Sequence, residues 1–138
     1  MEEAKLMEFK CKMKVRYNEC DMYGHVNHAV YLSYLENARI EFLDSLGISL
    51  RELTELGFRL FIVHISIDYR NAARFEDELT IITQISQLRQ VGGKFLQQIR
   101  CGETDIAFAE VKWACIDRQG KPTRLPPLLQ THLPPRES

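Results

Sequence analysis

The segment from Asp21 to Asn27, DMYGHVN, puts an acid, a histidine and an amide in one short turn, directly before a long apolar helical pattern. The free N–H groups at a helix N-terminus can polarise a carbonyl oxygen. A carboxylate held beside them can attack the carbonyl carbon or activate a water that does so. These residue types at this spacing therefore predict attack on a carbonyl, with Asp21 as the reacting acid.

Each polar residue of this turn also has a structural interpretation. Aspartate is common in turns, and Asn27 is a plausible helix N-cap. His25 could position an attacking water or bind the turn backbone. His25 and His28 have the spacing of a metal pair, but no further Cys or acid completes a ligand set, so no metal is expected. Cys20 precedes Asp21, and since adjacent strand residues point to opposite faces, Asp21 is the favoured nucleophile.

The elements that must position these residues are predicted from periodicity. Apolar residues repeat at helical spacing from Asn27 to Leu46, a helix on the order of 30 Å long at ~1.5 Å per residue. Alternation over Phe9–Tyr17 predicts a half-buried strand with a solvated lysine face. Ser49–Leu56 predicts a short second helix with a capping box. Four more strands are predicted, at Arg59–Tyr69, Leu79–Leu88, Phe95–Cys101 and Ile106–Ile116.

This order of elements predicts the α+β class, with a curved antiparallel sheet of five or six strands wrapped around one long central helix. The four later strands are expected to form a meander, and a short extended piece at Thr123–Leu125 would be the sixth strand. All 5 prolines lie from Pro122 onward. We therefore expect residues 1–126 to form one domain and residues 127–138 a loosely ordered tail.

Composition excludes several classes of protein. The chain has 138 residues, 45% of them hydrophobic and 27% charged, and a net charge of −1, which is typical of a globular domain and unlike a general nucleic-acid binder. Its 4 cysteines form no CxxC pair and are expected to be reduced. No apolar run is long enough to span a bilayer, and Met1–Lys10 lacks an apolar signal core. A cytoplasmic location is expected, although a processed organellar protein would look the same.

The chain resembles the hotdog-fold acyl thioesterases, in their 4-hydroxybenzoyl-CoA thioesterase-like branch. The resemblance covers roughly Phe9 to Pro126. It lies in the strand VRYNECD, the turn DMYGHVN, the helix start AVYLSYLENAR, the segment IDYRNAARFEDEL, and the closing DRQGKP and LP. The family often has proline where Ala72 stands here, which puts the local loop shape in doubt but not the catalytic turn.

The resemblance implies hydrolysis of an acyl-CoA or acyl-carrier-protein thioester without a cofactor. Asp21 would be the catalytic carboxylate, acting as nucleophile or as general base. Backbone N–H groups from Asn27 to Val30 would form the oxyanion hole, so that His28 contributes through its backbone more than its ring. His25 matches a histidine of plant acyl-carrier-protein thioesterases with this fold.

Seven residues are candidates for substrate binding: Tyr31, Tyr34, Glu36, Phe58, His64, Arg70 and Arg74. Core packing is the stronger interpretation of each aromatic residue, and His64 is expected to be a core histidine. Glu36 is either a second acid of the site or an ion-pair partner for Arg39 or for a partner chain. Arg70 and Arg74 could bind the phosphates of coenzyme A.

Hotdog domains usually pair their sheets edge to edge, so the resemblance implies a homodimer or a homotetramer. Residues 58–66 would then approach the partner's Asp21. Two other functions stay open: a thioester dehydratase on the same fold, and a binding module for acyl thioesters without catalysis. A dehydratase usually takes its acid from elsewhere in the dimer, whereas here the acid precedes the histidine on one turn.

Overall fold

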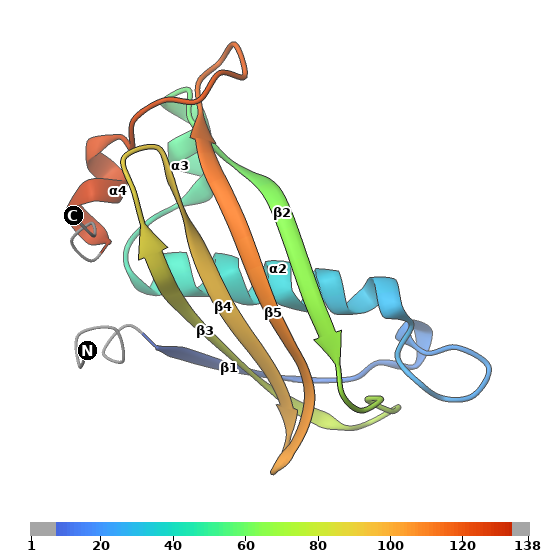
Figure 1. The fold of residues 1–138 in the computed structure, drawn as a ribbon. Coiled ribbons are helices and arrows are strands. Elements are labelled where there is room, and N and C mark those ends of the chain that lie inside the picture. The colour runs from blue at the N-terminus through green and yellow to red at the C-terminus, as the bar shows by residue number, and fades with distance from the viewer. Residues whose placement is uncertain (1–7, 134–138) are drawn as a thin grey trace.

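A five-stranded antiparallel sheet and one long helix dominate the computed structural model, which describes residues 8–133 (Figure 1). The strands are β1 (Phe9–Lys14), β2 (Arg59–Tyr69), β3 (Glu78–Leu88), β4 (Gly92–Cys101) and β5 (Thr104–Ile116). The helices are α2 (His28–Ser45), α3 (Leu50–Glu55) and α4 (Pro127–His132), and a 3-10 turn, η1, covers Tyr17–Glu19. The predicted α+β class and hotdog arrangement are confirmed.

The strands are ordered β1-β3-β4-β5-β2 across the sheet. β3, β4 and β5 form a meander, but β2 pairs with β5 rather than β3, so the predicted meander of four strands is wrong. Local periodicity carries no information about which distant strand becomes the neighbour. The β2–β3 connection therefore runs from one edge of the sheet toward the other, past the N-terminal end of α2 (Figure 1).

The two predicted helix starts are confirmed, together with their caps. The side chain of Asn27 accepts a hydrogen bond from the N–H of Ala29 at 2.9 Å, which satisfies one free donor of α2. Ser49 Oγ accepts from the N–H of Glu52 at 3.1 Å and caps α3. Gly47, with φ of +83°, follows the end of α2 in a conformation that glycine adopts without strain.

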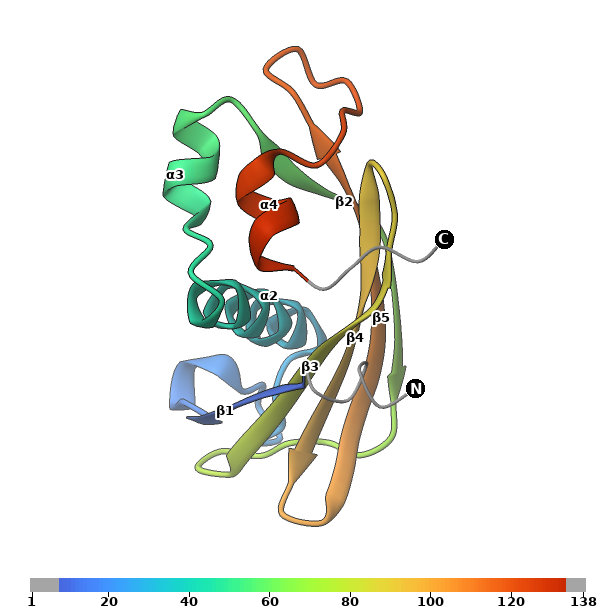
Figure 2. The same ribbon diagram turned by 90° about the vertical axis from the view of Figure 1, so that its left-hand side faces the viewer.

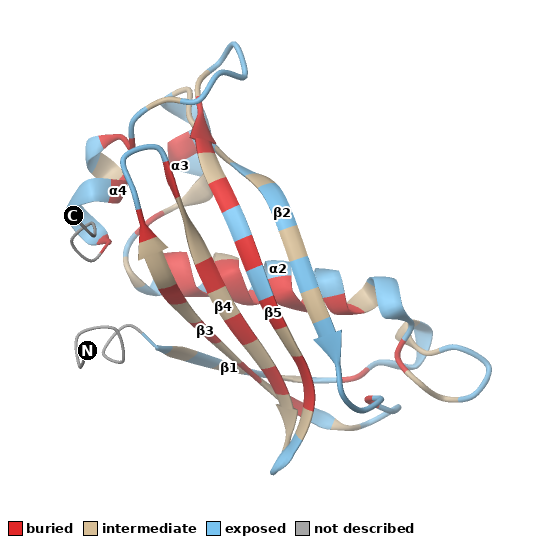
Figure 3. Ribbon diagram, in the orientation of Figure 1, coloured by how far each residue is buried: buried red, intermediate tan, exposed pale blue. Residues whose placement is uncertain are grey.

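Within residues 8–133, helices α2, α3 and α4 lie on one face of the sheet (Figure 2). Burial alternates along β5, as expected for a strand with one face against a core (Figure 3). The buried side chains form two clusters along α2, one around Tyr31 and Leu35 and the other around Phe42 and Trp113. No helix in residues 8–133 has the length and apolar character needed to cross a bilayer.

The expected loosely ordered tail is wrong for residues 127–132, which form α4. Leu129 is fully buried and Leu133 is 7% exposed, both within the second cluster. The prolines were misleading because proline is favoured in the first turn of a helix, where its missing N–H costs nothing. Residues 123–125 add no sixth strand, since only Pro122 forms an isolated bridge, with Ile116. Residues 134–138 lie outside the described part.

Candidate active site

The carboxylate of Asp21 closes its own turn. Its Oδ1 accepts hydrogen bonds from the backbone N–H groups of Tyr23 (2.9 Å) and His25 (3.2 Å). The N–H of Asp21 donates to the carbonyl of His25 at 2.7 Å, and Gly24 takes a φ of +78°, where glycine is favoured. Asp21 is exposed, and its Oδ2 has no hydrogen-bond partner within residues 8–133. One oxygen holds the turn while the other is available for chemistry.

Neighbouring segments fix this turn on both sides. The N–H of Asn27 donates to the carbonyl of Glu19 at 3.0 Å, and the N–H of Val26 donates to the carbonyl of Ala73 at 2.9 Å. The N–H of Ala73 in turn donates to the phenol oxygen of Tyr31 at 2.9 Å. The β2–β3 connection is thus tied to both the turn and α2, and it forms a wall of the site.

The N-terminal amides of α2 are mostly engaged. The N–H of Ala29 donates to the Asn27 side chain, and the N–H of Val30 donates to the Asn27 carbonyl at 2.9 Å. Asn27 itself donates to Glu19. Of the amides expected to form an oxyanion hole, His28 N–H is the one without an acceptor in the described chain. A helix N-terminus also carries a partial positive charge that favours an oxyanion there.

Asp21 and His28 open on one cleft of about 280 Å³. Its lining consists of Asp21, His25, Val26, His28, Tyr31, Tyr69, Arg70, Asn71 and Ala72. The ring of His28 stands edge-on to Tyr69, with centroids 5.1 Å apart, and the guanidinium of Arg70 lies 5.1 Å from the ring centre of Phe108. The predicted residues Asp21, His25, His28, Tyr31 and Arg70 therefore come together.

Asn27 caps α2 and is not among the residues that line the cleft. A contact between its amide and the substrate stays a prediction. His25 and His28 both reach the cleft, yet no group of three or more His, Cys, Asp or Glu side chains in residues 8–133 is arranged to hold a metal ion. Both interpretations of His25 stay open, because its N–H holds the turn and the residue lines the cleft.

Tyr34 packs in the core, as its more conservative interpretation predicts, and binds Glu19. The phenol O–H donates to Glu19 Oε1 at 2.8 Å, and the same oxygen accepts from the N–H of Arg16 at 2.8 Å. Burial and the bond to this carboxylate raise the pKa of Tyr34 well above its usual range. Sequence reasoning missed Glu19, which holds the start of the Asp21 turn; its spacing of three residues from Arg16, as in a capping box, was the available signal.

The thiol of Cys20 is a poor nucleophile. Burial and the nearby carboxylates of Asp21, Glu19 and Asp77 raise its pKa. A raised pKa lowers the fraction of reactive thiolate. The preference for Asp21 over Cys20 is therefore supported by the local charges as well as by the alternation of side chains along a strand.

Four predicted substrate residues lie elsewhere. Glu36 and Phe58 line a second pocket, further along α2. His64 is exposed on β2, so the expected core histidine is wrong: β2 is an edge strand, and a bulge between Ile62 and His64 breaks the alternation. Arg74 pairs with His25 through the backbone, while its side chain is exposed.

Comparison with known proteins identifies the family of this chain. A model of the thioesterase-like superfamily matches residues 15–133. The chain belongs to this superfamily. The long-chain acyl-CoA thioesterase FadM of Escherichia coli is 37% identical over 77% of this chain and 81% of its own length. The acyl-CoA thioesterase YbgC of Haemophilus influenzae is 34% identical, over 79% of this chain and 81% of its own.

Solved structures extend the match to three dimensions. A probable thioesterase from Bartonella henselae superposes with a TM-score of 0.82 at 32% identity, covering 86% of this chain and 99% of its own. This member of the thioesterase-like superfamily is thus a hotdog thioester hydrolase, as the resemblance implied.

Proposed function

We propose that this chain hydrolyses acyl-CoA thioesters to a free acid and coenzyme A, with Asp21 as the reacting carboxylate. The observation that carries the proposal is that two residues with an unused polar group line the same cleft: Asp21, with a carboxylate oxygen that has no partner in the described chain, and His28, with an N–H that has no acceptor there. A thioester carbonyl in this cleft would meet an acid near its carbon and a donor at its oxygen. The acyl-CoA thioesterases similar to this chain support coenzyme A as the carrier.

Two routes use the same groups. As general base, Asp21 takes a proton from a water whose oxygen attacks the carbonyl carbon; the C–S bond then breaks and the thiolate leaves. As nucleophile, Asp21 forms an anhydride with the acyl group, releases the thiolate, and is freed when water hydrolyses the anhydride. A single turnover in heavy-oxygen water separates them, because only the anhydride route can leave the label in the Asp21 carboxylate.

The test is thiol release from a panel of acyl-CoA and acyl-carrier-protein thioesters of different chain lengths. Hydrolysis releases one thiol for each acid formed. An enoyl-CoA that gains water without thiol release would replace the proposal with the dehydratase reaction. Saturable binding with no turnover across the panel would replace it with a non-catalytic binding module.

We propose that the active unit is a homodimer formed through β2. β2 spans 11 residues at the edge of the sheet, and it carries the exposed apolar side chains of Phe61 (55% exposed), Val63 (54%) and Tyr69 (44%). A long apolar edge strand with unpaired backbone groups is a template for pairing with a second chain. Antiparallel pairing of two β2 strands would bring residues 58–66 toward the partner's Asp21.

Lysines at the edge would disrupt such a dimer. The double variant Phe61→Lys/Val63→Lys is expected to elute as a monomer and to lose most of its thioesterase activity. Val91→Lys is a matched control, because Val91 is also apolar and exposed (41%) but lies on the β3–β4 hairpin. Light scattering after gel filtration gives the mass. A wild-type chain that is monomeric and fully active at assay concentration would contradict the proposal.

Arg70 is the stronger of the two proposed phosphate ligands, since it lines the cleft and Arg74 does not. Arg74 is exposed on the adjacent connection, where it could reach the same coenzyme A. The cytoplasmic location expected from the sequence stays a prediction.

A further inference from the structure

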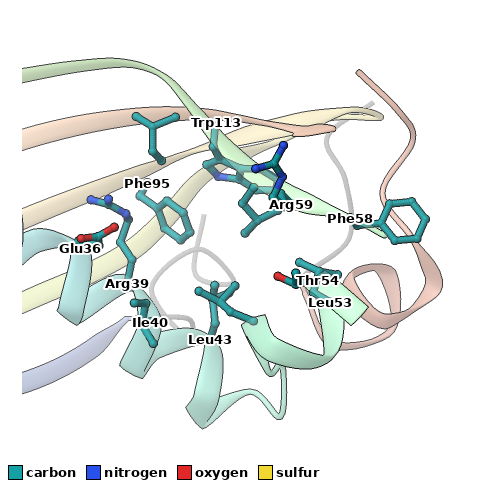
Figure 4. A pocket seen from close by; sticks show the side chains of 13 residues that line it. Glu36, Arg39, Ile40, Leu43, Leu53, Thr54, Phe58, Arg59, Phe95 and Trp113 are labelled. Atoms are coloured by element: carbon teal, nitrogen blue, oxygen red, sulfur yellow. The ribbon is translucent and has the colours of Figure 1, made fainter. Parts of the chain in front are cut away.

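The second pocket lies between the C-terminal half of α2, helix α3 and the sheet (Figure 4). Its volume is about 220 Å³. Apolar side chains make up most of its lining: Ile40, Leu43, Leu50, Leu53, Phe58, Leu60, Ile62, Phe95 and Trp113. An apolar cavity of ~150 Å³ is large enough for benzene. This pocket therefore has room for a ring or a short segment of acyl chain, and not for a whole acyl-CoA.

One wall of the pocket holds an unusual buried charge. Arg39 is 8% exposed, and its Nη1 donates to Gln97 Oε1 at 3.0 Å. Gln97 Nε2 donates to Thr83 Oγ1 and to the carbonyl of Leu35, both at 3.0 Å. Apart from tyrosine, tryptophan and cysteine, which pack in the core, the buried polar or charged residues of the described chain are Arg39, Thr83 and Gln97. They form a single network, which ends at the pocket.

The guanidinium of Arg39 lacks a close counter-charge. In residues 8–133, no carboxylate oxygen lies within 4.0 Å of it. Burial lowers the pKa of Arg39, and the more distant Glu36 offsets this only in part. A buried charge without a partner is costly, and a guanidinium has five N–H donors, of which Gln97 engages one. The remaining N–H groups of the Arg39 guanidinium favour a ligand that carries an oxygen able to accept a hydrogen bond.

The opposite wall is rigid. Trp113 is 3% exposed, and its ring packs against Phe95 with centroids 6.0 Å apart. A Cβ at Gly93 would stand 2.9 Å from the indole Cζ2, so only glycine leaves room for the ring there. The indole Nε1 is buried and has no hydrogen-bond partner in the described chain. Figure 4 shows Trp113 and Phe95 on the sheet side of the pocket and Leu43 and Ile40 on the helix side.

We propose that this pocket takes the far end of the acyl group and that Arg39 selects an acyl group bearing a hydrogen-bond-accepting oxygen at that end. The proposal rests on the proposed function and dimer, because residues 58–62 of the lining would face the partner's catalytic turn. The network through Gln97 and Thr83 holds the guanidinium in place before the substrate arrives. Arg39 would thus determine specificity, at a distance from the bond that breaks.

Matched substrates test this selectivity. Acyl-CoA thioesters of increasing length are compared with counterparts that carry a hydroxyl on the last carbon. At the length that reaches Arg39, the hydroxylated thioester is expected to have a kcat/KM about 10- to 100-fold higher, the usual range for a hydrogen bond to a charged group. Equal values at every length would overturn the proposal.

Two variants give a matched control. Arg39→Met keeps the length and apolar stem of the side chain, and it is expected to abolish the preference, measured as the ratio of kcat/KM for the hydroxylated and plain thioesters in the same variant. Arg59→Met changes another arginine of the same lining, one that is exposed, and should leave the preference intact. A preference unchanged in Arg39→Met would make the buried arginine a purely structural residue.

A binding readout separates this inference from the proposed function. Trp113 is the one tryptophan of the chain, so its fluorescence reports on the pocket even if no thioester is hydrolysed. Cyclohexanol and methylcyclohexane have nearly the same shape and differ in a hydroxyl. We expect cyclohexanol to bind more tightly to the wild type and to lose this advantage in Arg39→Met. If neither probe changes the fluorescence, or both bind alike, the pocket has no such selectivity.

Discussion

Two turns of this chain have the same pattern, D-x-x-G, and the same hydrogen bonds. In the first, Asp21 Oδ1 accepts from the N–H groups two and four residues later, and Gly24 has φ of +78°. In the second, Asp117 Oδ1 accepts from Gln119 (2.9 Å) and Lys121 (3.0 Å), and Gly120 has φ of +81°. Local sequence thus produces one turn geometry at two places.

The surroundings of the two turns differ. The Asp21 turn leads into α2, whose His28 amide and cleft lie beside the acid. The Asp117 turn follows β5, and its residue Arg118 donates to the carbonyl of Glu55 in α3 at 3.1 Å. A turn-forming aspartate and the proposed catalytic one can therefore have the same pattern of hydrogen bonds. What distinguishes them is the helix N-terminus and the cavity beside the acid.

The largest difference in activity between the two turns is expected when their aspartates are replaced by asparagine. Asp21→Asn keeps an oxygen that can accept from the turn, but it removes the carboxylate, and we expect kcat/KM to fall about 100- to 10,000-fold. Asp117→Asn makes the same change in the matching turn and should leave activity unchanged. Thiol release from a good acyl-CoA substrate measures both. Wild-type activity in Asp21→Asn would mean that this aspartate only forms a turn.

Replacing Gly24 or Gly120 with alanine distinguishes an effect on stability from an effect on catalysis. Neither glycine has an atom within 4 Å of an added Cβ, so Gly24→Ala and Gly120→Ala both add backbone strain without a clash. Each is expected to cost about 1 kcal/mol, or on the order of 4 °C in Tm, because the left-handed conformation disfavours a side chain. Only Gly24→Ala should also lower kcat/KM, by about 10-fold, since it shifts the acid.

Calorimetry and thiol-release assays on the same preparations test this pair. An equal loss of activity in both variants would mean that the assay reports global stability and not the position of Asp21. No change in Tm for either variant would contradict the assigned backbone conformations.

The smallest effect concerns the cysteines that precede the two turns. Burial raises the pKa of Cys115 from its ordinary value of 9.0 to about 11. The unfolded chain then loses this proton at lower pH than the folded one, so the free energy of unfolding should fall as pH rises from about 9 to about 11. Cys115→Ala should make this fall shallower, and Cys20→Ala should do so less. Urea unfolding at several pH values measures the slopes.

Local features of this molecule could be predicted well from its sequence. The caps Asn27 and Ser49, the glycine after α2 and the alternation along β1 depend on neighbours within a few residues. The position of Asp21 before a helix is local in the same sense. The order of the elements then predicted the antiparallel sheet that wraps around α2.

Features that depend on distant contacts could not be read in this way. The exposure of His64 follows from the position of β2 at the sheet edge, which is decided by pairing with β5. The buried contact of Arg39 with Gln97 joins residues 58 positions apart. Glu36 lies further along α2 than the cleft beside Asp21, and Phe58 precedes β2, so both belong to a different pocket from Asp21. Such placements come from packing, for which a single sequence contains no periodic signal.

The strand order also has a consequence for synthesis of the chain. The edge strands β1 and β2 are made first, yet β1 must wait for β3 and β2 must wait for β5 before either has a neighbour. Contacts between segments far apart in sequence close slowly, and unpaired strands are prone to aggregate meanwhile. The nascent chain therefore cannot complete its sheet until β5 has left the ribosome, and the apolar edge of β2 is exposed until then.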